Sequence, residues 1–229
     1  MPLKTYFNWS TGKDSAMALN ALLRDDRYSV AHLLTSVNAH HDRVSMHGVR
    51  TALLQRQVDA IGISALRIEL PEQPTNEEYE RLAGGKVAQL KAMGCEVAAF
   101  GDIFLEDLRR YREDQLATVG MKTVFPLWKR DTRELMAEFI TSGFRAITVC
   151  VNASLLDRSF VGRELDRSFL DDLPVNVDPC GENGEFHTFC YYAPFFKEPV
   201  PFSIGETVYR EYDNAGSKSG FWFCDLLPA

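Results

Sequence analysis

The stretch that decides the fold lies near the start of the chain and reads Ser10-Thr11-Gly12-Lys13-Asp14-Ser15. It follows an apolar stretch at residues 5–9 that predicts a strand, and it precedes residues 16–23, whose apolar spacing predicts a helix. A turn of small residues between a strand and a helix presents backbone N–H groups to an anion such as phosphate. Lys13 adds a positive charge that we expect to be mobile. The sequence therefore predicts a phosphate-binding turn at residues 10–15.

This turn differs from the Walker-type loop of ATPases that transfer the γ-phosphate. That loop requires Ser or Thr after its lysine and a glycine five residues before the lysine's own glycine. Here Asp14 follows Lys13, and Phe7 occupies the position of the first glycine. Transfer of a γ-phosphate is therefore not expected. The structural alternative is a polar turn in which Ser or Asp caps the helix.

The run resembles the Ser-Gly-Gly-x-Asp-Ser loop of the PP-loop ATP pyrophosphatases, which cleave ATP between its α- and β-phosphates. The resemblance implies a HUP-like, Rossmann-type nucleotide-binding unit whose loop holds the pyrophosphate portion of ATP together with Mg²⁺. Thr11 stands where this family often has glycine. Its Cβ narrows the approach of the phosphates, although its hydroxyl adds a donor.

Strands and helices alternate over the first 151 residues. Apolar patterns predict strands at 30–35, 66–70, 96–100, 123–125 and 146–151, and helices at 48–61, 75–93, 106–119 and 131–143. Two of these helices open on capping boxes, Thr75 with Glu78 and Asp131 with Glu134, and Gly84-Gly85 should weaken the middle of the first. This alternation predicts an α/β fold with an open, mainly parallel sheet and helices on both faces.

The pattern changes after residue 151. A loop-rich stretch with one expected helix at 162–170 leads into aromatic, strand-like pieces at 186–192, 208–212 and 221–224. We therefore expect two units: an ATP-binding unit at residues 1–151 and a smaller α+β extension at 152–229 that binds the substrate.

Ligands of open α/β sheets bind at the carboxyl ends of the strands. There the sequence places Ser36, which could flank the adenine ring, and Gly101 and Asp102, which could contact ribose, Mg²⁺ or an ammonium group. An ordinary strand end explains Ser36 nearly as well. Three other sets of residues have both a functional and a purely structural interpretation: His47, the arginines Arg109, Arg110 and Arg112, and the carboxylates Glu182 and Glu185.

The two carboxylates belong to the segment Cys180-Gly181-Glu182-Asn183-Gly184-Glu185-Phe186-His187-Thr188. Its glycines permit tight turns, and Glu182 and Glu185 can converge on one point. Paired carboxylates can orient an amine, accept its proton or hold magnesium. A hairpin turn with exposed acids is the structural alternative.

The segment resembles the Cys-Gly-Glu-Gly-Gly-Glu-aromatic-Glu-Thr motif of the diphthine–ammonia ligase family, a branch of the PP-loop enzymes. Asn183 and His187 depart from that motif. Further similarities extend the resemblance over residues 5–196: Gly101-x-Ile103, Asp107-x-x-Arg110-x-Arg112, Leu127-Trp128, Gly162-x-x-Leu165 and Pro194-x-Phe196.

The resemblance implies ATP-dependent amide formation: an acceptor carboxylate is adenylated with release of pyrophosphate, and ammonia then displaces AMP. In the family the acceptor is diphthine, a modified histidine of a translation elongation factor. The implied ATP-binding residues are Ser10, Thr11, Gly12, Lys13, Asp14, Ser15, Ser36, Gly101 and Asp102, and the implied catalytic residues are Lys13, Asp14, Glu182 and Glu185. Asp14 would orient the loop or the metal, and the two glutamates would hold the acceptor or take a proton from ammonium.

Composition agrees with a globular enzyme. The chain has 229 residues, of which 45% are apolar and 25% charged, and its net charge of -7 disfavours nucleic acid as the main partner. No apolar run approaches the roughly 18 residues of a membrane span, and the start lacks the apolar segment of a signal peptide. We expect a cytoplasmic protein with no membrane partner. We also expect its five cysteines to be reduced, because their number is odd and no export signal is found.

Two other functions remain open: an ATP-binding module without catalysis, and a PP-loop enzyme that modifies transfer RNA. The second would be expected to show a basic surface and often cysteine pairs, and neither is evident in the sequence. The acceptor, the nitrogen source, the metal ligands and the oligomeric state, a homodimer included, are not fixed by the sequence.

Overall fold

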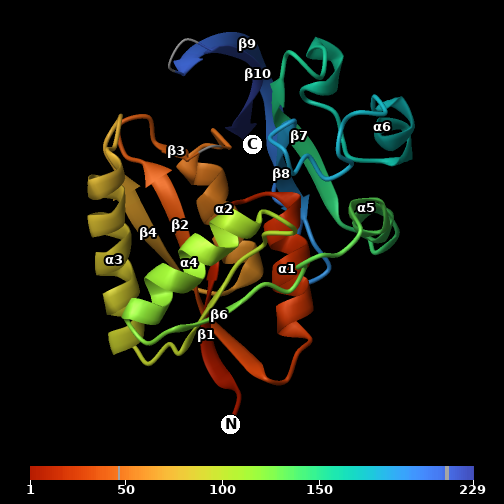
Figure 1. The fold of residues 1–229 in the computed structure, drawn as a ribbon. Coiled ribbons are helices and arrows are strands. Elements are labelled where there is room, and N and C mark those ends of the chain that lie inside the picture. The colour runs from red at the N-terminus through yellow and green to blue at the C-terminus, as the bar shows by residue number, and fades with distance from the viewer. Residues whose placement is uncertain (46, 215–216) are drawn as a thin grey trace.

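A parallel sheet forms the first part of the molecule, in a computed structural model that describes residues 1–45, 47–214 and 217–229 (Figure 1). Strand β1 (Leu3–Asn8) lies between β2 (Tyr28–Asn38) and β5 (Val97–Ala99), and all three are parallel. Strand β4 (Ala65–Leu70) pairs with β2 and β6 (Lys122–Val124) with β5, also in parallel. The short β3 (Arg43–Val44) runs antiparallel to the end of β2.

Helices cover both faces of this sheet, as the sequence predicted. On one face α1 (Lys13–Leu23) and α2 (Thr51–Ile61) bury their apolar sides in the cluster that contains Phe7. On the other face α3 (Asn76–Ala92) and α4 (Glu106–Thr118) contribute to the cluster around Tyr6. Adjacent residues of a strand point to opposite faces, so Tyr6 and Phe7 of β1 lie in different cores.

Local capping signals mark the helix starts. Thr75 and Glu78 form the reciprocal capping box predicted for α3, and the helix continues through Gly84-Gly85 without a break. The side chain of Asp131 accepts hydrogen bonds from the N–H groups of residues 133 and 134 at the start of α5 (Thr132–Thr141). These side chains satisfy N–H groups that the first turn of a helix leaves without a partner.

A second, antiparallel sheet forms the rest of the molecule. Its order is β8-β7-β10-β9, with β7 (Arg145–Asn152), β8 (Phe186–Tyr192), β9 (Phe202–Asn214) and β10 (Ser217–Pro228). The short helix α6 (Arg167–Asp172) lies beside it in Figure 1. The sequence placed residues 146–151 in the first sheet, and this was wrong: β7 pairs antiparallel with β8 and β10. An apolar run shows that a strand is buried on both faces but not which sheet contains it.

Three further predictions concern the start of α6, the state of the cysteines and the division of the chain. The helix expected at 162–170 begins only at Arg167, because residues 163–165 hydrogen-bond to the backbone of β7 and the side chain of Asp166 caps the first helical turn. All five cysteines are free and buried, as predicted. The division of the chain at residue 151 stays a prediction.

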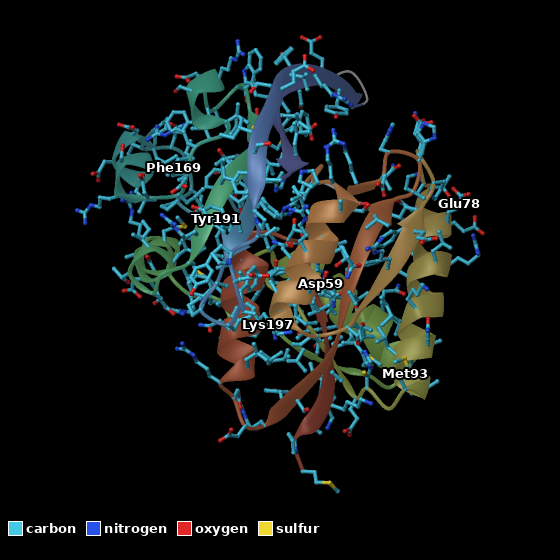
Figure 2. The ribbon with its side chains drawn as sticks, turned by 180° about the vertical axis from the view of Figure 1, so that it is seen from behind. Asp59, Glu78, Met93, Phe169, Tyr191 and Lys197 are labelled. Atoms are coloured by element: carbon cyan, nitrogen blue, oxygen red, sulfur yellow. The ribbon has the colours of Figure 1, made fainter. Side chains whose placement is uncertain are left out.

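One core joins the two sheets. Phe189 and Cys190 of β8 are fully buried in the same cluster as Leu19 of α1. A second link is a hydrogen bond from the backbone N–H of Lys197 to the carbonyl of Ala60 in α2. Lys197 is labelled beside α2 in Figure 2. No helix within the described ranges is long and apolar enough to cross a bilayer.

Gln57 of α2 is the polar centre of this joint core. It is 0% exposed, and its Oε1 accepts a hydrogen bond of 2.9 Å from Nε1 of Trp9. Its Nε2 donates to the carbonyl of Thr11 at 3.0 Å and to that of Cys190 at 2.6 Å. One buried side chain thus links the end of β1, the turn at residues 10–15 and the second sheet.

Replacing Gln57 should destabilise the protein. In a Gln57→Leu variant the buried N–H of Trp9 loses its acceptor, and a buried unsatisfied polar group costs about 1–3 kcal/mol. With two carbonyls also affected, we expect the free energy of unfolding in urea to fall by about 2–4 kcal/mol. Gln55→Leu, on the exposed side of the same helix, is the matched control and should change it by less than about 0.5 kcal/mol. Equal losses in both variants would contradict this role of Gln57.

A candidate active site at the carboxyl end of the parallel sheet

The turn at residues 10–15 lies where the direction of the chain connections changes. β1 leads to β2 on one side, while β5 pairs with the opposite edge of β1. Open α/β sheets bind ligands at such a switch point, outside the carboxyl ends of the strands. Gly101, which follows β5, packs directly against the turn, because a Cβ there would lie 3.1 Å from the backbone N of Ser15. The structure thus brings Gly101 and the predicted turn together.

Internal hydrogen bonds shape the turn. The hydroxyl groups of Ser10 and Ser15 are 2.7 Å apart, and that of Ser15 donates to the carbonyl of Gly12 at 3.1 Å. Gly12 is the N-cap of α1 and offers no capping side chain. Thr11 has a left-handed backbone with φ +76°, and its buried Oγ1 has no hydrogen-bond partner among the residues that the structure describes. Strained backbone and a buried hydroxyl without a partner are both typical of a loop that binds a polar ligand.

The second sheet holds the turn from outside. The backbone N–H of Cys190 donates to the carbonyl of Thr11 at 2.9 Å, and that of Lys13 donates to Oγ1 of Thr188 at 3.0 Å. A Cβ on Gly12 would come within 2.7 Å of Cε1 of His47, so only glycine fits at this position. The site is therefore built by both parts of the chain.

Lys13 is buried rather than mobile, contrary to the expectation from sequence. Its side chain is 2% exposed, and Nζ donates to Oδ1 and Oδ2 of Asp14 at 2.8 and 2.7 Å and to the carbonyl of Cys180. Burial alone would lower the pKa of Lys13, but the negative charge of Asp14 raises it above its usual value. Lys13 is thus a fixed cation that ties the acidic segment to the turn.

Glu182 lies in the electrostatic field of this turn. Burial, reinforced by the negative charges of Asp14 and Asp102, raises the pKa of Glu182 well above its usual value, although Lys13 opposes the shift. Asp102 forms an ion pair with Arg112, and burial raises its pKa as well. The charges of Asp14 and Asp102 thus act on the partly buried Glu182, and Lys13 and Arg112 oppose them. A carboxylate with a shifted pKa beside other charged groups is typical of functional sites.

Glu185 has a different environment. It is 2% exposed and accepts hydrogen bonds from the N–H of Asp178 at 3.0 Å and from the N–H and side-chain amide of Asn183 at 2.8 and 3.0 Å. Burial would raise the pKa of Glu185, but these hydrogen bonds lower it below its usual value. The carboxylate of Glu182 has other neighbours, since its pKa responds to Asp14, Lys13 and Asp102. The convergence of the two carboxylates on one point stays a prediction. Glu185 shapes the turn that carries Glu182.

Two histidines stand against the turn. The rings of His47 and His187 are 5.0 Å apart, and Nδ1 of His47 lies 3.0 Å from the carbonyl of Thr188. Burial, with a further contribution from His187, lowers the pKa of His47 to about 3. Burial also lowers the pKa of His187. Both rings are therefore neutral at pH 7, and His47 packs against Gly12.

Of Ser36, Arg109 and Arg112, only Arg112 forms an ion pair with another predicted site residue in the described part of the chain. Ser36 lies within β2, where its carbonyl accepts a hydrogen bond from Ser45, and its contact with adenine stays a prediction. Arg112 joins the site through Asp102, whereas Arg109 pairs with Glu113 and lies over the ring of Trp128.

Sequence reasoning missed Gln57 and Thr188. Gln57 lies on the apolar side of α2, between Leu54 and Val58, and this placement of a polar residue was a usable signal. Nothing in the local sequence indicated the contact between Thr188 and Lys13.

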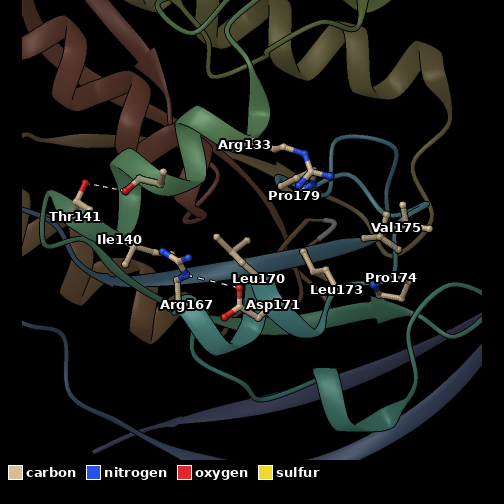
Figure 3. A pocket seen from close by; sticks show the side chains of 12 residues that line it. Arg133, Ile140, Thr141, Arg167, Leu170, Asp171, Leu173, Pro174, Val175 and Pro179 are labelled. Carbon is tan, nitrogen blue, oxygen red and sulfur yellow. Dashed lines mark hydrogen bonds and ion pairs between the residues drawn. The ribbon is translucent and has the colours of Figure 1, made fainter.

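A separate cavity has a volume of about 320 Å³. Figure 3 shows the side chains that line it. It is lined by apolar residues of α5, α6 and the following loop, such as Ile140, Leu170 and Leu173, with the exposed Arg133 and Arg167. None of the predicted site residues lines it. We therefore place the active site at the turn and not in this cavity.

A Rossmann-type sheet with this turn at its switch point, and with carboxylates gathered beside it, defines an ATP-binding protein of the PP-loop class. Family models support a narrower assignment. The model of the diphthamide synthase N-terminal domain matches residues 3–123, and that of the diphthamide synthase C-terminal domain matches residues 131–215. The chain belongs to the diphthamide synthase family.

Curated relatives named diphthine–ammonia ligase agree with this assignment. The chain is 27% identical to the Danio rerio protein over 240 residues, which cover 90% of this chain and 93% of the relative. It is 25% identical to the Homo sapiens protein over 236 residues, covering 86% and 87%. The Rattus norvegicus protein is 31% identical over 153 residues, covering 61% and 57%.

The different environments of the two glutamates predict different effects on stability. Glu185→Gln replaces one oxygen, which accepts hydrogen bonds, by an NH₂ group, which only donates them. The free energy of unfolding should therefore fall by about 2–3 kcal/mol. Glu182→Gln removes a charge that burial and like charges disfavour, and should leave stability at pH 8 unchanged or higher. Urea unfolding of both variants measures this difference. A loss in Glu182→Gln as large as that in Glu185→Gln would show that Glu182 is structural.

The lowered pKa of His47 predicts that the folded protein loses stability in acid. Because its pKa is lower in the folded protein, the unfolded chain binds the proton more readily between its own pKa of about 6.5 and the folded value. The free energy of unfolding should therefore fall with falling pH in this window, by about 1.4 kcal/mol per pH unit from this residue. His47→Gln should remove that part of the slope. Unfolding series from pH 7 to 5 test this, and an unchanged slope in His47→Gln contradicts it.

Proposed function

We propose that this chain is an ATP-dependent ligase of the diphthine–ammonia type, which forms an amide and converts ATP to AMP and pyrophosphate. One observation carries the proposal: the acidic segment of the second unit reaches the phosphate-binding turn of the first and is held there by Lys13. An ATP-binding module without catalysis would need the turn but not this segment.

The first step is adenylation. A carboxylate oxygen of the acceptor attacks the α-phosphorus of ATP, the bond from that phosphorus to the β-bridging oxygen breaks, and pyrophosphate leaves. The backbone N–H groups and the hydroxyls of Ser10, Thr11 and Ser15 bind the pyrophosphate portion, and Gly12 allows its close approach. The fixed charge of Lys13 stabilises the negative charge that develops on the leaving group.

Asp14 and Asp102 fit a magnesium site by their chemistry, since Mg²⁺ takes carboxylate oxygens together with phosphate oxygens. Asp102 follows Gly101, and a Cβ on Gly101 would lie 3.3 Å from the backbone carbon of Asp14, so the two aspartates come from backbone segments that pack against each other. Bound Mg²⁺ would supply positive charge to the phosphates.

The second step is amide formation. The nitrogen of ammonia attacks the acyl carbon, and the bond from that carbon to the AMP oxygen breaks. Ammonium must lose a proton before it can attack, and Glu182 is the residue best suited to accept it. A base is most effective when its pKa lies near the working pH, and burial shifts that of Glu182 in this direction. Glu185 supports Glu182 by shaping the turn between them.

The acceptor is a carboxylate of the diphthine type, as the names of the curated relatives indicate for those proteins. A cytoplasmic location and the absence of a nucleic-acid partner belong to the same proposal. The structure favours no particular oligomeric state.

Product analysis tests this function. The chain is incubated with ATP, ammonium and an elongation factor that carries diphthine, and nucleotides are separated by chromatography. We expect AMP and pyrophosphate in amounts equal to the amide formed. Asp14→Asn and Glu182→Gln should lower the rate at least about 100-fold, in the range of lost catalytic groups. Glu77→Gln, an exposed acid on α3, should retain full activity. Formation of ADP, or AMP release that Asp14→Asn leaves unchanged, would contradict the proposal.

A further inference from the structure

Three metal-ligating side chains converge away from the active site. His40 and His41 are adjacent in the turn between β2 and β3, and Glu72 follows β4. Nε2 of His41 lies 3.6 Å from Oε1 of Glu72, and Nε2 of His40 lies 3.9 Å from the same oxygen. All three ligand atoms fall within 4.8 Å of one another. Over the described ranges of the chain, this is the one group in which three His, Cys, Asp or Glu ligands come this close.

Hydrogen bonds hold the two loops that carry these side chains. The side-chain oxygen of Asn38 accepts from the N–H of His41 at 3.0 Å, and its amide donates to the carbonyl of Glu72 at 3.0 Å. The N–H of Ala39 also donates to the carbonyl of Leu70 at 2.9 Å. Asn38 is the last residue of β2, so it fixes both loops to the ends of neighbouring parallel strands. The backbone positions of the three ligands are therefore set before any ion binds.

The spacing fits a tetrahedral cation. Zinc binds imidazole nitrogen and carboxylate oxygen at about 2.0–2.2 Å, which places neighbouring ligand atoms about 3.4 Å apart. The distances from Oε1 of Glu72 to the two imidazoles exceed this by only a few tenths of an ångström. The three side chains are 50–62% exposed, so rotation of exposed side chains can close the gap and a water molecule can fill the fourth position. Two imidazoles and one carboxylate favour Zn²⁺ over Mg²⁺ or Ca²⁺, which prefer oxygen ligands.

We propose that His40, His41 and Glu72 form a binding site for one divalent cation of the Zn²⁺ type. The ion would be bound by Nε2 of each histidine, by Oε1 of Glu72 and by water. It would link the β2–β3 turn to the loop between β4 and α3. An ion that binds only the folded chain stabilises it, so the site would strengthen the carboxyl end of the sheet on the β2–β4 side. The site shares no residue with the turn at 10–15 or with the segment at 180–188.

Equilibrium dialysis against ZnCl₂ tests the site. The full chain is first freed of metal with EDTA, and dialysis is done at pH 7.5 without nucleotide, with zinc measured by mass spectrometry. His41→Ala and Glu72→Ala each remove one ligand, and circular dichroism shows whether they remain folded. His32→Ala and Glu77→Gln are matched controls, since His32 lies earlier in β2 beside Ser64 and Glu77 lies in α3.

The wild-type chain and both controls should bind one equivalent of zinc. Their affinity for zinc should be at least 10-fold higher than that of His41→Ala or Glu72→Ala. Asn38→Ala should weaken binding about 10-fold, as loss of a residue that orients ligands does. The melting temperature of the wild-type chain should rise with zinc, and that of His41→Ala should not. Equal zinc binding by wild type, His41→Ala and Glu72→Ala would overturn the proposal, and so would the absence of binding by the wild-type chain.

Discussion

The buried ammonium group of Lys13 is the interaction on which the rest of this structure depends. A charge removed from water costs several kcal/mol unless ion pairs and hydrogen bonds compensate it. Here Asp14 of the turn and the carbonyl of Cys180, in the segment before β8, provide that compensation. Because this one cation has partners in both segments, the acidic segment cannot leave the turn without leaving Lys13 partly unpaired. The electrostatics of the turn thus fix the position of a segment about 170 residues away in the chain.

This constraint gives the two glutamates of the segment separate functions. Glu185 accepts three hydrogen bonds and has a low pKa, so its carboxylate builds the turn. Glu182 extends from that turn toward Asp14 and Asp102, where burial and like charges keep its pKa high. A single short motif therefore contains one carboxylate that stabilises structure and one that is available for proton transfer. Similar residues with opposite pKa shifts are a frequent basis for assigning acid–base roles.

Much of the architecture could be predicted from sequence because its signals are local. The turn at residues 10–15, the capping box of Thr75 and the alternation of strands and helices each depend on neighbours in the chain. The position of β7 in the second sheet could not be predicted, because strand pairing is decided by packing between distant segments. The same holds for Lys13, whose sequence context suggested a mobile cation, and for Thr188, which reaches it from β8. Local patterns gave the residues of the candidate site, and tertiary contacts decide the surroundings of each one.

The central claim is that ATP binds with its phosphates on this turn while Lys13 holds Glu182 beside the α-phosphate. A crystal structure of the chain with the non-cleavable analogue α,β-methylene ATP tests it most directly. The account predicts that the triphosphate lies on the backbone of residues 10–15, that Lys13 still contacts Cys180, and that Glu182 faces the α-phosphate. A nucleotide bound elsewhere, or one bound at the turn with Glu182 directed away from it, would contradict the account.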